Sequence, residues 1–379
     1  MLLLSQEIHP IPPTKGAAVE QWIYAVTQRL SRYKPYVVSV PHPWRPNEEQ
    51  EQNVHFHRIQ IGRLYTRIFR KITRLDPWSY TDRVAQYAKR MRIDIIHVHN
   101  APKIFEALAQ KKCAKKYILH MHNEKNEAVH EQANALVGCS EYIKNWYKNK
   151  NFPAKKFVAL ANGIDAEMYP IPSRNSTNQQ ALRHLYEIPP NKFIVMYVGR
   201  VSPEKGPDLL IQAFNYLDLD KYHLVMLGEW PKGMSTKNTR VKFAEELKPL
   251  LGKISHTLID VVSPEEVPRL YQLGDLMMIP SRFEEPFSMV AIEAMAAGLP
   301  VMALRRGGMA EYMTHQVNSL VLDPDSSPSQ IAQAIQHALA NRASLVDLSI
   351  NARNLVIEKF TWERVAKSTE ALYDELLAE

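Results

Sequence analysis

Two glutamates flank the start of a short apolar segment and could bind a sugar-containing ligand. The pattern over residues 288–297 predicts a helix that follows a strand and stops at a Gly-Leu-Pro sequence. Glu285 lies just before this helix, and Glu293 lies eight residues after Glu285, about two helical turns along. One carboxylate could accept hydrogen bonds from a sugar and the other from a ribose. The free N–H groups at the helix start, with the helix dipole, would form a site for a phosphate or a sugar hydroxyl. These N–H groups belong to Phe287, Ser288 and Met289.

Two neighbouring loops supply the cations and close backbone approaches that such a ligand needs. Arg200 and Lys205 share one glycine-containing loop after an apolar run, and a guanidinium fork with an ammonium suits a diphosphate. Gly307 and Gly308 form a turn after another apolar run. Taken alone, two glutamates eight residues apart are more often structural, and two loop cations are more often solvated. It is the combination of the three segments that favours a binding site.

The elements that position these residues indicate an α/β fold class. Apolar runs alternate with amphipathic segments, which is typical of parallel sheets covered by helices, so we predict two doubly wound Rossmann-like domains that face a central cleft. Helices are predicted at residues 17–30 and 77–91. Strands are predicted at residues 2–4, 36–40, 93–98, 117–120, 135–139 and 157–160, and then at 193–198, 222–227, 257–262, 276–279, 300–303 and 319–321.

Composition excludes several classes of protein. The 379 residues are 45% hydrophobic, too apolar for a disordered chain, and only Cys113 and Cys139 are present, so a disulfide scaffold or a structural zinc site on cysteines is not expected. The net charge of +7 is uneven, with 27 basic and 15 acidic residues up to position 175 and 20 and 25 after it. The basic half indicates an anionic partner. It lacks the aromatic platform of a nucleic-acid binder, so no nucleic acid is expected.

The chain resembles the retaining GT-B glycosyltransferases of family 4. Within that family the resemblance is greatest to the spore-coat-associated enzymes of bacilli. It covers nearly the whole chain, through the Arg200 and Lys205 loop, Glu285 and Glu293 in the EX7E spacing, the Gly-Gly-x-x-Glu turn, Asp94 to His99, Leu119 to Glu124, Asn162 to Asp165 and Phe360-Thr-Trp362. It implies an N-terminal domain over residues 1–170 joined by a returning C-terminal helix at 361–379, a polar linker at 171–180 and a nucleotide-sugar-binding domain at 181–360.

The resemblance also implies a role for each motif residue. Arg200 and Lys205 would neutralise the donor diphosphate, Glu293 would bind the ribose, and Glu285 would hold the transferred sugar together with the amides of residues 287–289. His122 would lie beside that sugar across the cleft, Gly16 would approach the diphosphate from the N-terminal domain, and the backbone of Val261 and Val262 would border the nucleobase. Two positions depart from the family pattern. Ala17 replaces a second glycine, and Ser288 stands where glycine is common, which we expect to matter little if only its N–H is used.

The reaction that the resemblance implies is transfer of a sugar from a nucleotide-diphosphate sugar, with retention of the anomeric configuration. UDP is the first expectation for the donor nucleotide, with GDP or ADP as alternatives, and the acceptor would be a glycan, a lipid-linked precursor or a cell-surface or spore polysaccharide. No cofactor and no metal is expected, because the two Asp-x-Asp sequences, at 218–220 and 323–325, lie in polar turns. Two alternatives stay open: a non-catalytic coat or surface protein that retains the fold, and a sugar-nucleotide epimerase on the same fold.

Two further patterns concern location and histidines. The opening Met1–Leu4 is too short for a signal-peptide core, so we expect a cytoplasmic protein. Peripheral attachment to the inner membrane face and association with the spore stay open as further options. Residues 58–74 combine basic residues with an apolar stripe at helical spacing, which predicts either a helix on an anionic bilayer or an ordinary surface helix.

His97 and His99 alternate with apolar residues in a predicted strand, and we expect them to face opposite sides or ends of it.

Overall fold

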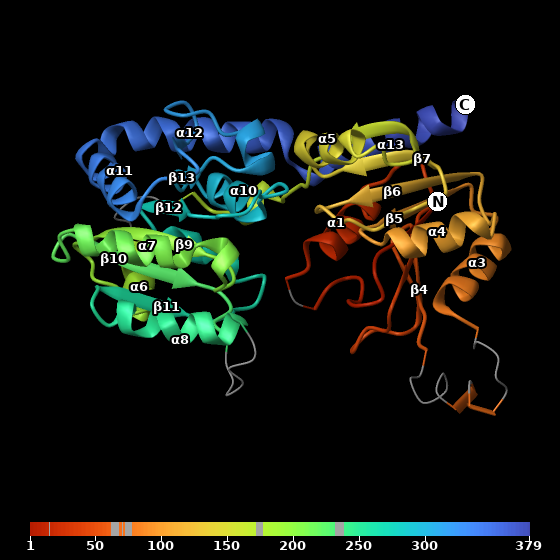
Figure 1. Ribbon diagram of the computed structural model, residues 1–379, viewed down its shortest axis with the longest axis horizontal. Helices are drawn as coiled ribbons and strands as arrows, with labels where there is room; N and C mark the ends of the chain where they lie inside the picture. The colour runs from red at the N-terminus through yellow and green to blue at the C-terminus, as the bar shows by residue number, and fades with distance from the viewer. Residues whose placement is uncertain (15, 62–67, 70, 73–77, 172–176, 232–238) are drawn as a thin grey trace. The chain divides into compact units, whose positions relative to one another are not determined.

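The computed structural model describes residues 1–379 except 15, 62–67, 70, 73–77, 172–176 and 232–238, and the described residues form two compact units (Figure 1). Unit 1 comprises residues 1–163 and 362–379, and unit 2 comprises residues 164–361. The expected linker at 171–180 therefore lies within unit 2, where its last four residues begin a helix, α6 (Thr177–Leu185). Residues 172–176 of that segment lie outside the described residues.

Unit 1 is built on an eight-stranded sheet in the order β3-β4-β2-β1-β5-β6-β7-β8, parallel except for the β3–β4 hairpin at one edge. Strand β1 pairs with both β2 and β5, so the order of the chain reverses between β1 and β5. The strands are β1 (Leu2–Leu4), β2 (Tyr36–Ser39), β3 (Glu48–Glu51), β4 (Val54–Arg58), β5 (Ile95–His99), β6 (Lys116–Met121), β7 (Ala133–Gly138) and β8 (Ala154–Ala159). The helices are α1 (Ala18–Thr27), α3 (Tyr80–Arg90), α4 (Pro102–Gln110), α5 (Glu141–Asn149) and α13 (Trp362–Ala378).

The β3–β4 hairpin was not predicted from the sequence. Strand β3 reads Glu-Glu-Gln-Glu, which carries no apolar signal, and its residues alternate between exposed and half-buried. Strand β4 alternates more clearly, with Val54, Phe56 and Arg58 buried on one face. The side chain of Arg58 is fully buried and its guanidinium lies 2.8 Å from a carboxylate oxygen of Glu49 on β3. A buried cation with a partner replaces the apolar residue that the pattern would require at that position.

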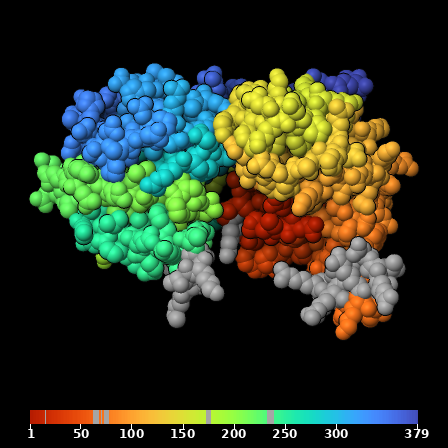
Figure 2. Space-filling view, in the orientation of Figure 1, coloured from red at the N-terminus to blue at the C-terminus, as the bar shows by residue number. Residues whose placement is uncertain are grey.

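Helix α13 returns the end of the chain to unit 1, as the resemblance implied. Trp362, Tyr373 and Leu376 of this helix are buried in the same hydrophobic core as Trp22 of α1. Polar contacts reinforce the packing, because Glu370 accepts hydrogen bonds from the backbone N–H groups of the chain just after α1, at 2.7 and 2.8 Å. Figure 2 shows part of this helix, in dark blue, at the surface beside the yellow residues of unit 1.

Unit 2 contains a six-stranded parallel sheet in the order β11-β10-β9-β12-β13-β14. Because β9 pairs with both β10 and β12, the chain reverses direction across the sheet between β9 and β12. The strands are β9 (Phe193–Val198), β10 (Tyr222–Leu227), β11 (His256–Ile259), β12 (Leu276–Ile279), β13 (Val301–Leu304) and β14 (Leu320–Leu322). The helices besides α6 are α7 (Pro207–Ala213), α8 (Thr239–Leu251), α9 (Val267–Leu270), α10 (Met289–Ala296), α11 (Pro328–Ala340) and α12 (Arg342–Lys359). Buried residues of α7, α8 and α11 share one core with the sheet.

Each unit is thus a doubly wound α/β domain, in which ligands bind at the carboxyl ends of the strands where the strand order reverses. The predicted strands are all present within a few residues of their expected bounds. Among the described residues, no helix combines the length and the apolar character that crossing a membrane would require.

Candidate active site

The reversal between β9 and β12 brings the two main sequence motifs of unit 2 together. The loop after β9 carries Arg200 and Lys205, and the loop after β12 carries Glu285. The ammonium of Lys205 donates a hydrogen bond to Oε1 of Glu285 at 2.8 Å, and the hydroxyl of Ser281 donates to the same oxygen at 2.5 Å. Glu285 is only 4% exposed, so its carboxylate is held in a fixed orientation. A cation and a carboxylate thus meet at one point of the sheet edge.

A second set of contacts fixes the backbone of these two loops. Arg282 forms a bidentate ion pair with Asp208 at the start of α7, with both N···O distances 2.5 Å. The backbone N–H of Arg282 also donates to the carbonyl of Glu204 at 2.9 Å. Gly206 has a φ of 65°, and a Cβ there would lie 2.1 Å from the carbonyl oxygen of Pro280. Only glycine permits this close approach, which explains why the Lys205 loop ends in glycine.

The glycine turn after β13 lies against the backbone of Glu285. Gly307 has a φ of 53°, and a Cβ there would lie 2.3 Å from the carbonyl oxygen of Glu285. The N–H of Gly308 donates to that carbonyl at 2.7 Å, and the N–H of Gly307 donates to the side chain of Glu284. The loops after β9 and β13 therefore both contact Glu285, the first at its carboxylate and the second at its backbone carbonyl.

Helix α10 begins directly after this cluster, at Met289. Ser288 precedes it with a φ of 70° and a ψ of 92° and makes no side-chain capping bond. A non-glycine residue in this left-handed region is strained, which costs stability. The expectation that serine matters little for donor binding, where only its N–H would be used, stays a prediction. The hydroxyl of Tyr312 holds the strained turn by donating to the carbonyl of Phe287 at 2.6 Å. The first N–H groups of an α-helix have no intrahelical partner, which makes those of α10 suited to an anion or a hydroxyl.

Glu293 lies one turn into α10 and contacts a buried tyrosine. The hydroxyl of Tyr271 donates to Oε2 of Glu293 at 2.6 Å. Burial raises the pKa of the Glu293 carboxyl above its ordinary value, and the Tyr271 hydrogen bond opposes that rise. A half-buried carboxylate with one oxygen bonded to the protein leaves the other oxygen free to accept hydrogen bonds from a ligand.

Arg200 differs from Lys205 because its side chain is exposed. Its guanidinium forms no ion pair with any residue of the described part of the chain, while its carbonyl accepts a hydrogen bond of 2.7 Å from the hydroxyl of Tyr197. Burial raises the pKa of Tyr197, the charge of Glu285 raises it further, and the charge of Arg200 lowers it. The charges of Glu285 and Arg200 therefore act on the hydroxyl of Tyr197 in opposite directions.

A pocket of about 220 Å³ lies at the carboxyl ends of β9, β10 and β11. Its walls are mostly apolar, and Trp230 and Asp260 contribute an indole and a carboxylate; the remaining lining residues are Tyr197, Gly199, Val201, Met226, Leu227, Gly228, Leu258 and Ile259. Val262 follows two residues after this lining and is half-buried. Sequence reasoning missed Trp230, although a lone tryptophan directly after a predicted strand could have indicated a pocket wall.

The two expected site residues of unit 1 lie on segments that follow its strands. His122 comes directly after β6, and Nδ1 of His99 lies 3.2 Å from its Nε2. Burial lowers the pKa of His122 to about 3, so the imidazole is neutral at pH 7. Gly16 is exposed just before α1, with open space within 4 Å of where a Cβ would stand.

The chain is similar to known proteins over nearly its whole length. The family model described as "Glycosyl transferases group 1" matches residues 178–355, and that described as "Glycosyltransferase Family 4" matches residues 19–168. The lipopolysaccharide 1,2-N-acetylglucosaminetransferase of Salmonella typhimurium is 30% identical over 369 residues, which is 96% of this chain and 95% of that protein. The chain belongs to glycosyltransferase family 4.

Other similar proteins agree with this assignment. Spore coat protein SA of Bacillus subtilis is 28% identical to the glycosyltransferase over 391 residues, covering 98% of both chains. Among solved structures, sucrose-phosphate synthase from Thermosynechococcus elongatus superposes with a TM-score of 0.75 at 19% identity, over 100% of this chain and 99% of that one. HepE of Anabaena in complex with UDP and glucose gives a TM-score of 0.74 at 19% identity, over 98% and 99%. These two confirm the GT-B fold.

One segment of the glycosyltransferase differs from its sequence-based interpretation. Arg58 was expected to begin a basic helix over 58–74, yet it lies in β4 with its side chain buried. It is therefore unable to contact a membrane surface. Most of the remaining segment lies outside the described residues, namely 62–67, 70, 73 and 74. Ile68 and Ile72, which are described, are 52% and 75% exposed.

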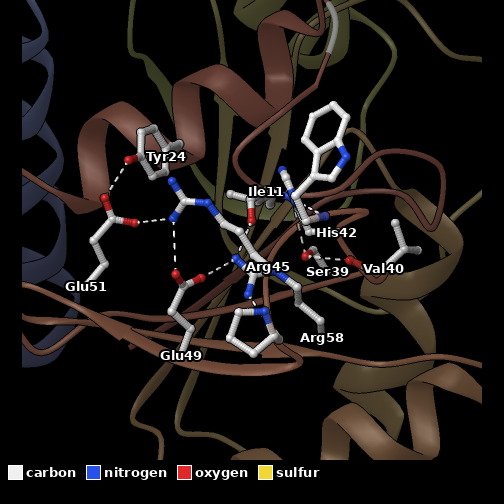
Figure 3. A network of polar contacts seen from close by, with 11 residues as sticks. Ile11, Tyr24, Ser39, Val40, His42, Arg45, Glu49, Glu51 and Arg58 are labelled. Carbon is white, nitrogen blue, oxygen red and sulfur yellow. Dashed lines mark hydrogen bonds and ion pairs between the residues drawn. The ribbon is translucent and has the colours of Figure 1, made fainter.

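Buried and half-buried ion pairs hold the surface loop that follows β2 (Figure 3). Arg58 donates to the carbonyls of Ile11 and Pro46, which ties the loop after β1 to the loop after β2. Arg45 in the second loop pairs with Glu49 at 3.3 Å and with Glu51 at 2.6 Å. These contacts hold the loop at Arg45 and Pro46, directly after Trp44.

At the tip of this loop, Trp44 is 80% exposed, the highest exposure of any large hydrophobic residue in the described part of the chain. Its ring contacts His42 edge-on, with the ring centroids 5.7 Å apart. The backbone N–H of Trp44 also donates to Nδ1 of His42 at 3.1 Å. The loop thus presents an ordered apolar face to solvent.

Proposed function

We propose that this glycosyltransferase transfers a sugar from a UDP-sugar to a glycan or lipid-linked acceptor, with retention of the anomeric configuration. The observation that carries the proposal is the meeting of Lys205 and Glu285 at the strand reversal of unit 2, directly before the N-terminus of α10. HepE, which shares the fold, was solved with UDP and with UDP-glucose. This supports UDP as the first donor nucleotide, with GDP and ADP as alternatives.

Each residue of the site has a proposed contact on the donor. Arg200 is exposed and free to move onto the diphosphate, and Lys205 is placed to exchange part of its contact with Glu285 for a phosphate oxygen. The first N–H groups of α10 and the carboxylate of Glu285 hold the transferred sugar, and the free oxygen of Glu293 accepts from the ribose. The apolar pocket beside Val262 takes the nucleobase, with Trp230 as a stacking surface.

The proposed mechanism relies on charge and position. When the bond between the anomeric carbon and the diphosphate breaks, negative charge grows on the leaving phosphate, and Arg200 and Lys205 stabilise that charge. These two cations do the work that a metal ion performs in other transferases, so we propose that transfer needs no metal. The leaving phosphate takes the proton of the acceptor hydroxyl on the same face of the sugar, which retains the configuration. His122 and Gly16 contribute from unit 1, the neutral imidazole as a hydrogen-bonding group for the sugar.

We propose that the acceptor binds to unit 1 through the loop that carries Trp44. Sugar rings present apolar C–H faces that stack on aromatic side chains, and Trp44 is exposed on a loop that ion pairs hold at Arg45. A rigid platform loses little conformational entropy on binding. The name of the Salmonella relative, lipopolysaccharide 1,2-N-acetylglucosaminetransferase, supports a glycan acceptor.

The donor proposal is tested by ligand-induced thermal stabilisation. Wild-type protein and Glu293→Gln are heated with UDP, GDP and ADP and with their common sugars, without and with a chelator. A ligand at a hundred times its dissociation constant stabilises the folded state by about 2.7 kcal/mol, which is measurable. We expect uridine ligands alone to raise the melting temperature of wild-type protein, with a smaller rise for Glu293→Gln. A rise with guanosine or adenosine ligands instead would replace UDP in the proposal.

A non-catalytic coat protein is the second candidate, because Spore coat protein SA is similar over nearly the full length of both chains. The two candidates differ in one measurement, release of UDP from the bound UDP-sugar. An active enzyme releases UDP slowly by hydrolysis of the UDP-sugar, and it releases UDP faster when an acceptor glycan is added. If the protein binds a UDP-sugar but never releases UDP with any of a panel of glycans, the structural role takes precedence.

A further inference from the structure

Four histidines gather on one face of the unit 1 sheet. His97 and His99 belong to β5, His120 belongs to β6 and pairs directly with His99, and His122 follows β6. Our expectation that His97 and His99 face opposite sides or ends of the strand was wrong, because residues two apart in a strand point to the same side. Their rings stack with centroids 4.3 Å apart. A His-x-His pattern in two adjacent strands therefore places four imidazoles together.

The interior three of these histidines are completely buried. His97, His99 and His120 each have no exposed surface, and Trp22 of α1 covers them with ring centroids 4.7 to 5.7 Å away. His122 is partly exposed at the edge of the group. The cluster is thus a group of polar side chains buried within the apolar core of unit 1.

Most nitrogens of the buried rings have no hydrogen-bond partner among the described residues. Nδ1 of His97 bonds to the hydroxyl of Tyr373 at 2.7 Å, and Nδ1 of His99 bonds to His122 at 3.2 Å. The Nε2 atoms of His97 and His99 and both ring nitrogens of His120 are buried without a partner. Buried polar atoms are nearly always satisfied in folded proteins, so the nitrogens of this cluster call for a further bound group.

We propose that His97, His99 and His120 form a binding site for one late first-row divalent metal ion, with Zn²⁺ as the physiological occupant. One ring nitrogen from each of the three lies within 4.8 Å of the others. A tetrahedral ion with Zn–N bonds of about 2.0–2.1 Å requires nitrogens about 3.3 Å apart. The rings stack in the structure described here, so they must turn about their Cβ–Cγ bonds for their lone pairs to converge on the ion. Imidazole nitrogens are preferred ligands of zinc, copper, nickel and cobalt ions.

The outer hydrogen bonds have the form found around metal-bound histidines. A ligating histidine usually bonds through its other ring nitrogen to a partner that fixes its orientation. Tyr373 does this for His97 and His122 does it for His99, and in both cases Nε2 is left for the ion. The buried indole N–H of Trp22 also lacks a partner and would donate to a water molecule in the fourth coordination position.

The hydrogen bond between His97 and Tyr373 links the proposed site to the C-terminal helix. Because Tyr373 belongs to α13, an ion on His97 would also strengthen the attachment of the C-terminal helix to unit 1. The ion is structural and is separate from the donor site of unit 2.

The test measures metal content directly and does not depend on glycosyltransferase activity. The full chain is purified without a histidine tag, stripped with a chelator, incubated with ZnCl₂ and freed of excess metal by gel filtration. Elemental analysis is expected to give one zinc per chain. The same protein incubated with CoCl₂ is expected to show the visible absorption of a four-coordinate cobalt site. Zinc is also expected to raise the melting temperature of the stripped protein.

Two variants make the result specific. His120→Gln is expected to lose at least nine-tenths of the bound zinc, whereas His223→Gln is expected to keep it, because both ring nitrogens of His223 already bond to Ser255 and Thr257. If His120→Gln does not fold by circular dichroism, His97→Gln replaces it. The proposal is overturned if wild-type protein retains no zinc above the buffer level, if cobalt shows only the spectrum of the hydrated ion, or if a folded cluster variant retains as much zinc as wild type.

Discussion

The ammonium of Lys205 lies 2.8 Å from Oε1 of Glu285, although 80 residues separate them in the sequence. The two residues follow β9 and β12, which are neighbours in the sheet because the strand order reverses between them. This contact joins the proposed diphosphate-binding cation to the carboxylate proposed to hold the sugar. It also makes the stability of the site depend on the residues that would perform its chemistry.

Replacing Lys205 and Arg200 one at a time should show that Lys205 contributes to both stability and activity, whereas Arg200 contributes to activity alone. Lys205→Ala leaves Glu285, whose side chain is 5% exposed, without its counter-ion, and we expect the free energy of unfolding to fall by about 1–3 kcal/mol. Arg200→Ala removes an exposed side chain, so stability should change by less than about 0.5 kcal/mol. Both variants should lose sugar-transfer activity by at least about tenfold. Urea unfolding and steady-state kinetics measure these effects, and a fully active Arg200→Ala would exclude Arg200 from the donor site.

Removing the charge of Glu293, unlike removing that of Lys205, should increase the stability of the folded protein at pH 7. Because burial raises the pKa of Glu293 above its ordinary value of 4.5, the folded state favours the protonated form, and this contribution to stability is lost as the pH rises through the raised pKa. Glu293→Gln removes that loss while its amide oxygen still accepts from Tyr271. We expect the variant to be more stable than wild type at pH 7 and equally stable below pH 4.5, where both side chains are neutral. Thermal unfolding across this pH range would contradict the argument if the stability difference were constant.

The strained residue before α10 offers a gain in stability. Ser288 has a φ of 70°, which glycine adopts without strain, so Ser288→Gly should raise the free energy of unfolding by about 1 kcal/mol. Ser368→Gly is the matched control, since Ser368 is exposed within α13, and it should lower the free energy of unfolding by about 0.5–1 kcal/mol. Equal losses in the two variants would show that the conformation of Ser288 costs nothing.

Trp44 should affect the acceptor and leave the donor unchanged. Trp44→Ala is expected to raise the acceptor KM about tenfold, the factor that corresponds to about 1.4 kcal/mol of lost contact. UDP binding and thermal stability should stay as in wild type, because Trp44 is 80% exposed. Tyr216→Ala serves as the control, since Tyr216 is an exposed aromatic residue of unit 2 at 59%. An unchanged acceptor KM in Trp44→Ala would exclude the loop as the acceptor platform.

Helix α13 should detach more easily at low pH. Burial alone would raise the pKa of Glu370, but the hydrogen bonds from the backbone of Arg32 and Ser31 outweigh it and hold the pKa below its ordinary value of 4.5. A lowered pKa stabilises the folded state above pH 4.5, and this contribution is lost as the pH falls through the lowered pKa. Glu370→Gln should therefore be less stable than wild type at pH 7, with a difference that narrows as the pH falls below 4.5. Hydrogen exchange of the α13 amides follows this attachment.

Most of the secondary structure could be predicted from the sequence because strand and helix periodicities are local. The apolar runs at 193–198, 222–227 and 276–279 coincide with β9, β10 and β12. The β3–β4 hairpin escaped prediction because Arg58 occupies a core position, where only the pairing with Glu49 makes burial of a cation tolerable. A pairing of this kind depends on two strands meeting, and neither sequence segment reveals it alone.

The sequence by itself determined the family, the two α/β halves and the types of residue available for chemistry, because motif order and spacing are properties of the chain. Only the tertiary structure decided how these residues are combined. It placed Lys205 on Glu285 by reversing the strand order, held Ser288 in a left-handed conformation through Tyr312, and assembled four histidines beneath Trp22. These relationships depend on which strands become neighbours and which side each residue faces, and both are set by the packing of the whole unit.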